Sequence, residues 1–373
     1  MNPRVLEIPG SLIRKVAARK RPTSIDLGLG EPTLLPTRAH FDSAMRYVAD
    51  HGVKYTANAG DGALRDAIAR HYRYPGLEKG GNVCVTAGSQ EAMYVSLMTL
   101  LDPSCDELLV VEPAFPSYVK MAALNGVACR TVTMREDDDF AFDADRILAG
   151  VGGATRAIVL CSPCNPTGRV LSCDQADLLA RGLEQRGGDI WLIHDEIYRE
   201  QTFTADAAHL AQCYPQTIVT NSVSKSNALT GLRLGWILAP ERFVKHAVKA
   251  HAWVTSCTDT FAQHVALHVF SSAGGVGEHS AWYADQRRAV LAALAEHGVR
   301  FVPVDGAFYA CVRLPDGVNS LAAAGDLIDD YDVVTIPGIA FGAALEGWLR
   351  LSWVAPIADF REGLSRIAKF MSS

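Results

Sequence analysis

One short stretch of the sequence combines a lysine and an arginine with very little side-chain bulk. In SVSKSNALTGLRLGW, residues 222–236, Lys225 stands among serines, and Arg233 follows eight positions later. A lysine in a confined, desolvated site loses proton affinity and becomes an amine nucleophile that forms Schiff bases with carbonyl compounds. Arg233 stays cationic and can bind a phosphate through two hydrogen bonds. Because such a pair alone is usually solvated charge, its interpretation depends on other groups.

Three further candidate groups stand where expected strands end. Residues 88–90, Gly-Ser-Gln, lie between a strand and a helix, where free N–H groups and the helix dipole favour an anion. Asn165 lies in a rigid Asn-Pro-Thr-Gly turn and can orient a ligand oxygen. Asp195 follows the apolar run IWLI and needs a cationic or protonated partner if buried, while Tyr198 offers a phenol nearby. Each group, taken alone, can also be a plain turn or surface loop.

The elements that position these groups follow an alternating pattern. From about residue 82, short apolar runs rich in β-branched residues alternate with helical patterns, which predicts a mainly parallel α/β sheet. In such a sheet, ligands bind outside the carboxyl ends of the strands, where the four groups would meet. The expected strands are residues 82–88, 107–113, 126–134, 154–163, 190–196, 217–225 and 231–240.

The periodicity changes beyond about residue 262. Residues 261–270 and 282–298 have the pattern of amphipathic helices, and residues 301–314 and 333–341 have that of strands. A chain of 373 residues exceeds the size of one hydrophobic core. We therefore expect a second, smaller α+β domain.

Composition excludes several classes of partner. The 35 Lys and Arg residues are outnumbered by 41 Asp and Glu residues, so the net charge of -6 predicts no binding of nucleic acid. No apolar run approaches the roughly 18 residues of a membrane span, and the N-terminal residues contain no apolar stretch of secretory length. The nine scattered cysteines are typical of a reduced, cytoplasmic protein.

Three near-motifs do not predict chemistry. Cys161 and Cys164 form a CxxC, but proline and glycine follow at once instead of a helix, and no second pair could complete a zinc site. His264 and His268 lack the glutamate of a metalloprotease motif, and residues 28–33 lack the third glycine of a dinucleotide fingerprint. We expect no metal.

The candidate groups together suit a ligand with an aldehyde, a ring nitrogen, a ring hydroxyl and a phosphate, all of which pyridoxal 5′-phosphate has. The sequence also resembles the class I/II aminotransferases of fold type I, especially aspartate-aminotransferase-like enzymes. The resemblance runs from GLGEPT, residues 28–33, to LRLSW, residues 349–353. Between them KYTANAGDGALRDAIA, TAGSQEA, SPCNPTG, HDEIY and SVSKSNALTGLRLGW occur in the family's order.

This resemblance implies an architecture and a reaction. The fold would be α/β, with a mainly parallel seven-stranded sheet between helices in a large domain and a smaller α+β domain. Residues 1–44 would be an N-terminal segment of the small domain, residues 45–262 the large domain, and residues 263–373 the C-terminal small domain. The enzyme would be a cytoplasmic homodimer with shared active sites. By a ping-pong mechanism, it would move an amino group from an L-amino acid to a 2-oxo acid.

The resemblance also implies roles for individual residues. Lys225 would form the Schiff base with the cofactor and carry the proton between the substrate Cα and the cofactor's C4′. Asp195 would keep the pyridine nitrogen protonated, while Tyr198 and Asn165 would hydrogen-bond the ring oxygen. The phosphate would be bound by Ser89, Gln90, Ser222 and Arg233, together with Tyr55 of the neighbouring subunit.

Four positions would serve the ring and the substrate. Phe115 would stack on the cofactor ring, where the family more often has tryptophan or tyrosine. Arg350 would take the substrate α-carboxylate with Asn165, and Gly30 would let the backbone approach the substrate. No cation for an acidic side chain is identifiable from the sequence. The apolar stretch at residues 33–35 instead favours a neutral substrate.

Two alternatives remain beside a transaminase. A pyridoxal-phosphate C–S lyase or other β-lyase could use the same fold and the same groups. A ligand-sensing domain of a transcription regulator would carry a basic helix-turn-helix domain before the sheet, but only about 25 residues precede GLGEPT and the net charge is negative. The transaminase is therefore our main prediction.

Overall fold

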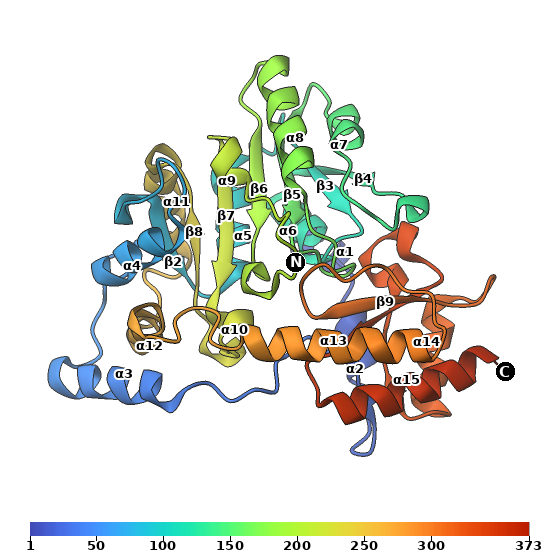
Figure 1. Cartoon of the computed structure of the whole chain (residues 1–373). Helices are drawn as coiled ribbons and strands as arrows, with labels where there is room; N and C mark the ends of the chain where they lie inside the picture. The colour runs from blue at the N-terminus through green and yellow to red at the C-terminus, as the bar shows by residue number, and fades with distance from the viewer. Residues whose placement is uncertain (373) are drawn as a thin grey trace.

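The computed structural model describes residues 1–372 and is built around a seven-stranded sheet (Figure 1). Its strand order is β2-β8-β7-β6-β5-β3-β4, and every pair is parallel except those of β8 with its two neighbours. All seven strands lie in runs that the sequence predicts. They are β2 (Val83–Thr86), β3 (Glu107–Glu112), β4 (Ala128–Thr133), β5 (Thr155–Cys161), β6 (Trp191–Asp195), β7 (Thr217–Ser222) and β8 (Gly235–Leu238).

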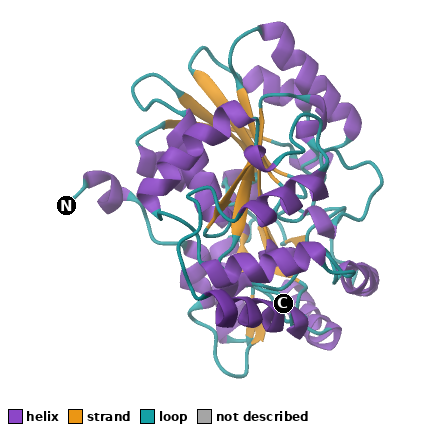
Figure 2. Ribbon diagram, turned by 90° about the vertical axis from the view of Figure 1, so that its left-hand side faces the viewer, coloured by secondary structure: helices purple, strands orange, loops and turns teal. Residues whose placement is uncertain are grey.

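Helices cover both faces of this sheet, which explains why its central strands are apolar on both sides. In β3, for example, Leu108 and Val110 pack into one hydrophobic cluster, whereas Leu109 and Val111 pack into another. Figure 2 shows the strands enclosed between helices. The first face carries α5 (Ser89–Leu100), α6 (Ser117–Asn125) and α11 (Glu241–Val254). The second carries α4 (Gly62–Tyr72), α7 (Ala144–Gly150), α8 (Cys173–Arg186), α9 (Leu210–Cys213) and α12 (Thr260–Ser271).

A smaller antiparallel sheet lies beside the carboxyl ends of the large one. It consists of β11 (Ile336–Pro337), β12 (Trp348–Ser352) and β9 (Tyr309–Arg313), in that order. The accompanying helices are α13 (Ser280–Glu296), α14 (Ser320–Asp329) and α15 (Ile357–Ser372). The strands predicted over residues 301–314 and 333–341 are shorter than expected. Residues 302–308 are outside any strand, and a 3-10 turn occupies residues 338–341.

The N-terminal residues run alongside the C-terminal part of the chain. The short helices α1 (Pro3–Glu7) and α2 (Leu12–Ala17) precede β1 (Ile25–Asp26), which pairs in parallel with β10 (Val333–Val334). The expected domain boundaries at residues 44 and 262 fall inside α3 (Arg38–His51) and α12, two helices that pack against each other. No helix within residues 1–372 is long and apolar enough to cross a membrane.

Candidate active site

A cavity of about 510 Å³ opens where the carboxyl ends of the large sheet face the small sheet. It collects side chains that lie more than 300 positions apart in the sequence, because both sheets and the N-terminal residues contribute to its wall. All but two of the site residues expected from the sequence line this cavity. Those present are Gly30, Ser89, Gln90, Phe115, Asn165, Asp195, Tyr198, Lys225, Arg233 and Arg350.

Lys225 lies in α10 (Val223–Ser226), a single helical turn directly after β7. Its ammonium donates a hydrogen bond of 2.7 Å to the carbonyl oxygen of Gly30. Burial lowers the pKa of Lys225 to about 8, opposed by Glu31 and assisted by the nearby positive charge of Arg350. Near neutral pH a useful fraction of this amine is therefore unprotonated and able to act as a nucleophile or a base.

Asp195 is the last residue of β6 and is 8% exposed. The Tyr118 hydroxyl donates to its Oδ2 at 2.6 Å, and the Ile197 N–H donates to its Oδ1 at 3.3 Å. Burial raises the pKa of this carboxyl, while these hydrogen bonds lower it. No Lys, Arg or His within residues 1–372 lies within ion-pair distance of Asp195, so the carboxylate suits a cationic ligand group such as a protonated ring nitrogen.

The start of α5 and Arg233 form an anion site. Gly88, with φ +83°, is the residue before α5, and no side chain caps the helix. The N–H groups of the first turn therefore have no helical partner and can bind an anion. The Arg233 guanidinium donates to the carbonyl oxygens of Thr230 at 2.9 Å and Ala87 at 3.5 Å. The φ of Gly88 lies in a region that residues with a Cβ rarely adopt, which favours glycine here, and a Cβ would also come within 2.5 Å of Arg233 Nη2. The arrangement fits a phosphate.

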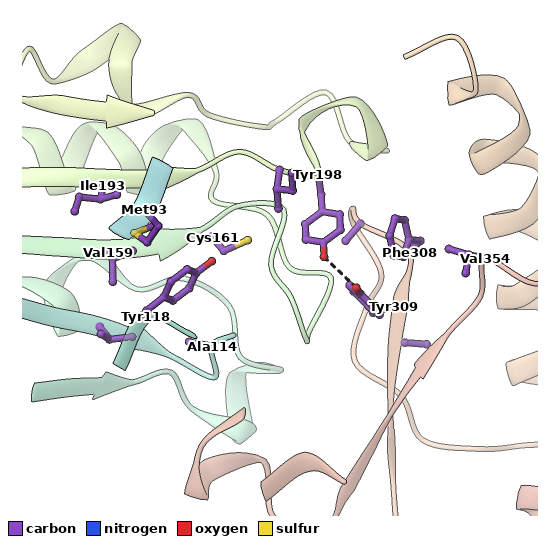
Figure 3. Packing of buried hydrophobic residues seen from close by; sticks show 14 of the residues in the cluster. Met93, Ala114, Tyr118, Val159, Cys161, Ile193, Tyr198, Phe308, Tyr309 and Val354 are labelled. Atoms are coloured by element: carbon purple, nitrogen blue, oxygen red, sulfur yellow. Dashed lines mark hydrogen bonds between the residues drawn. The ribbon is translucent and has the colours of Figure 1, made fainter. Parts of the chain in front are cut away.

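Two tyrosines from opposite sides of the cavity meet beside Asn165. The hydroxyls of Tyr198 and Tyr309 lie 3.0 Å apart and point toward one another (Figure 3). The Asn165 amide donates to the Tyr198 hydroxyl at 3.5 Å. Gly30 approaches from the N-terminal side, where a Cβ would overlap the Tyr309 hydroxyl. These polar groups therefore lie together in a region too close-packed for additional side chains.

Arg350 is a buried cation without an acidic partner. It lies in β12, is 2% exposed, and donates to Asn165 Oδ1 at 3.0 Å and to the carbonyl oxygen of Gly28 at 2.5 Å. Its guanidinium lies over the rings of Tyr309 and Phe341, at 4.2 and 4.8 Å from their centroids. No carboxylate of the described chain pairs with it, and its Nε has no hydrogen-bond partner. A carboxylate ligand would satisfy this charge.

Two expected site residues do not line the cavity. Ser222 is buried, and its hydroxyl accepts the N–H of Ser224 at 3.1 Å, so it caps α10 while Ser224 faces the cavity. Tyr55 lies in the loop between α3 and α4 and is 89% exposed. Neither residue therefore lines the cavity.

Several lining residues were missed by the sequence prediction. Tyr118, in α6, reaches Asp195 across the sheet end, and its only sequence signal is a place three residues after Phe115. Tyr309 and Arg14 come from segments without a recognisable motif. Residues 33 and 34 do not line this cavity and instead line a separate hollow with Trp282.

The cysteines and histidines form no alternative centre. All nine cysteines are free, and burial raises the pKa of both Cys161 and Cys164, which makes these thiols poor nucleophiles. Within residues 1–372 no cluster of three or more His, Cys, Asp or Glu side chains could hold a metal ion. The chemistry of this cavity therefore rests on its lysine, carboxylate, tyrosines and arginines.

This fold and this set of groups define a pyridoxal-phosphate-dependent enzyme of fold type I. The chain belongs to the family described as aminotransferase class I and II, whose model matches residues 22–367, and it is an aminotransferase. An aspartate aminotransferase of Pyrococcus horikoshii is 32% identical, over 98% of this chain and 96% of that protein. A probable N-acetyl-LL-diaminopimelate aminotransferase of Bacillus subtilis is 30% identical, over 100% and 95% respectively.

The solved structures agree with this assignment. The crystal structure of the aspartate aminotransferase of Thermotoga maritima superposes with a TM-score of 0.93 at 28% identity and covers 100% of both chains. An aspartate aminotransferase from Thermus thermophilus gives a TM-score of 0.91 at 27% identity, covering 99% of both chains. The predicted fold, cofactor and enzyme class are confirmed.

Proposed function

We propose that Lys225, Asp195 and Arg350 are the central groups of a transaminase that exchanges an amino group between amino acids and 2-oxo acids in two half-reactions. One observation carries this assignment. The cavity holds an amine with a lowered pKa, a buried carboxylate without a cation and a buried guanidinium without an anion. The amine can bond to the aldehyde of pyridoxal phosphate, and the carboxylate can pair with its protonated ring nitrogen. The guanidinium can pair with the α-carboxylate of a substrate.

The bound cofactor supplies an electron sink that makes the Cα proton of the substrate acidic. Lys225 Nζ would hold the cofactor, and the same amine, with its lowered pKa, would accept the proton from the substrate Cα. Asp195 would keep a proton on the ring nitrogen through its negative charge, and the Tyr118 hydroxyl, 2.6 Å from Oδ2, holds that carboxylate in place. Tyr198 and Asn165 would donate hydrogen bonds to the ring oxygen. Phe115, which borders the cavity, would pack against the ring.

The remaining residues bind the two anionic ends. Ser89, Gln90 and Arg233 would hold the phosphate, supported by the free N–H groups of α5 and by the space that Gly88 leaves. Arg350 and Asn165 would bind and orient the substrate α-carboxylate. We assign Ser222 a supporting role, because its hydroxyl caps the helical turn that carries the lysine.

We further propose a homodimer in which Tyr55 reaches the phosphate of the partner subunit. Tyr55 is 89% exposed, and Val53 and Trp253 are 70% and 93% exposed, which is unusual for large apolar side chains. The loop that carries Tyr55 is held in place, because Gln263 accepts from the Asp61 N–H and donates to the Thr56 hydroxyl. Sedimentation equilibrium should report twice the 40.2 kDa mass of the chain, and a monomer would exclude this arrangement.

We place the enzyme in the cytoplasm, and its domain boundaries in the loops beside α3 and α12. Nine free cysteines, four of them buried, support a reducing compartment. The pairing of β1 with β10 supports grouping the N-terminal segment with the C-terminal part of the chain.

Replacement of Lys225 tests the assignment. The holoenzyme of Lys225→Ala should lose both the visible absorption of the bound cofactor and transamination. Lys245→Ala, which removes an exposed lysine of α11, should retain both. If Lys225→Ala keeps the absorption and the activity, the assignment is wrong.

A second measurement separates transfer from elimination. Incubated with an amino acid alone, the wild-type holoenzyme should convert its cofactor to pyridoxamine phosphate and release the matching 2-oxo acid without ammonia. Release of pyruvate and ammonia in repeated turnovers would instead identify a β-lyase.

A further inference from the structure

Glu278 is a carboxylate outside the cavity at which segments far apart in the sequence meet. Its Oε2 accepts the Thr37 hydroxyl at 2.7 Å, and its Oε1 accepts the Asn227 amide at 3.2 Å. The side chain is only 10% exposed and does not line the cavity. We propose that Glu278 is a positioning residue, which holds the helical turn of Lys225 in place through Asn227. This inference rests on the transaminase function proposed above.

Asn227 directly follows α10, the turn that carries Lys225, and it is fully buried. Its Oδ1 accepts the Ser226 hydroxyl at 2.8 Å, while its Nδ2 donates to the carbonyl oxygen of Gly275 at 3.1 Å and to Glu278. In a buried site each polar group needs a partner, and the two N–H bonds of this amide have one acceptor each. The orientation of Asn227, and with it the end of the Lys225 turn, therefore depends on Glu278.

Helix α13 begins beside Glu278 and holds the same turn a second time. The Tyr283 hydroxyl donates to the carbonyl oxygen of Lys225 at 3.2 Å, and Gln201 Nε2 donates to that oxygen at 3.3 Å. The ring of Phe308 stacks on Tyr283 with the centroids 5.8 Å apart, and it lies 5.9 Å from Lys225 Nζ. Because the lysine is held at its backbone, a shift of the turn moves Nζ relative to the cavity.

Glu278 also joins two places at which the chain passes between the large and the small sheet (Figure 1). The chain reaches α3 through residues 27–37 and leaves α12 through residues 272–279. Thr37 lies at the end of the first passage, and Glu278 lies near the end of the second. Their hydrogen bond therefore ties both passages to the Lys225 turn, although neither residue borders the cavity.

The Glu278 carboxylate carries a negative charge in this setting. Burial raises its pKa, but the two hydrogen bonds and two neighbouring histidines together bring the pKa below its usual value. These histidines are His40, with Nε2 3.4 Å from Oε2, and His279, with Nε2 3.6 Å from Oε1. Asn227 therefore donates to a charged acceptor, which makes the hydrogen bond about twice as strong as one between neutral groups.

The first test measures acylation of Lys225 by acetic anhydride in the cofactor-free full-length chain, with peptide mapping. Glu278→Ala and Asn227→Ala should raise the pH at which the rate levels off by about one unit, because a loosened turn lets Nζ reach water. Loss of a negative charge alone would lower this pH, so a rise in Glu278→Ala reports a displaced amine. The charged residues that act on Lys225 stay unchanged, and they are Glu31, Arg350, Arg233 and Arg14.

Glu107→Ala is the matched control for this measurement. The Glu107 carboxylate accepts the Thr155 hydroxyl at 2.9 Å at the amino end of β3, on the edge of the sheet opposite to the cavity. Its loss should leave the acylation profile as in wild type. An unchanged or lowered plateau pH in Glu278→Ala would overturn the proposal. If Glu278→Ala does not fold, Asn227→Ala decides by the same criterion.

Half-reactions of the holoenzyme give a second readout. Glu278→Ala should lower the maximal rate about tenfold and leave the half-saturating substrate concentration within about threefold, because the amine is displaced and Arg350 is not. Asn227→Asp, which sets two carboxylates face to face, should lose a similar factor. The double variant Glu278→Gln/Asn227→Asp exchanges donor and acceptor at constant net charge and should restore part of the rate.

A change confined to the half-saturating concentration, or no restoration by the double variant, would overturn the proposal. Failure of the transaminase function would look different, because the acylation test needs no cofactor. In that case the plateau would still shift in Glu278→Ala, whereas the wild-type holoenzyme would transfer no amino group.

Discussion

Removal of a single hydroxyl should show how strongly the protein controls the ring nitrogen of the cofactor. Tyr118 does not reach the substrate through its hydroxyl, which donates instead to Asp195 Oδ2 at 2.6 Å inside the protein. Tyr118→Phe keeps the ring, which packs beside Phe115 with the centroids 6.2 Å apart, and deletes only the donor. Tyr118 is 3% exposed, so water cannot easily replace the lost hydrogen bond.

The magnitude follows from the type of bond. A hydrogen bond to a charged acceptor contributes about 1.5–3 kcal/mol in a buried site. Burial already raises the pKa of Asp195, and loss of the Tyr118 donor raises it further, so the ionised carboxylate becomes less favourable. If most of this free energy is lost from the transition state, kcat/KM falls about 10- to 100-fold, since each 1.36 kcal/mol is a factor of ten.

The assay is a set of half-reactions with several amino acids, together with the pH dependence of the cofactor's absorption. Because Tyr118 acts through Asp195 on the ring, the loss should be the same factor for every substrate, and the absorption spectrum should change before any substrate is added. Tyr214→Phe is the control, since it removes a comparable bond, 2.8 Å to the Ile190 carbonyl oxygen, far from the cavity. A loss confined to one substrate, or an unchanged spectrum and rate, would refute the reasoning.

Two other predictions address the phosphate site and the lysine. Gly88→Ala should weaken pyridoxal phosphate binding at least about tenfold in equilibrium dialysis, because φ is +83° at this position and the new Cβ would displace Arg233. Gly62→Ala is the control and should not weaken binding, because the space around its Cβ is open. In the cofactor-free protein, the rate of Lys225 acylation should rise with pH and level off above about 8, because the amine is protonated below that pKa and neutral above it. A plateau only near the ordinary lysine value of 10.5 would contradict this, and peptide mapping by mass spectrometry would assign the modified residue.

The predicted strands of the large sheet are correct because local and tertiary requirements coincide there. The central strands are short β-branched runs, bounded by turn residues and covered by helices on both faces, so burial leaves a continuous apolar signal, whereas the edge strand β4 is largely exposed. In the small sheet the signal is weaker. The run from 301 to 314 becomes a strand only from Tyr309, after a proline, a glycine and an isolated bridge between Phe301 and Val312.

The residues of the site also differ in how well the sequence alone predicts their position. Lys225, Asp195 and Asn165 lie at or just after the ends of strands, so residue type and position predict a ligand site there, whereas the role of each residue is implied by the family resemblance. Ser222 carries an equally clear motif, but the geometry of the helical turn directs its hydroxyl to the Ser224 N–H instead of the cavity. Spacing along the chain does not specify which way a hydroxyl points, because that depends on a backbone turn of a few residues.

By itself, the amino-acid sequence determined the fold class, the cofactor and the groups at the strand ends, because a buried parallel sheet leaves continuous apolar runs and gathers its polar residues at one edge. Only the tertiary structure brought Tyr118 to Asp195, 77 positions away, and placed Arg14 beside the strand pair that carries Arg350. Contacts between distant segments depend on how elements pack, and no local pattern in this chain encodes them.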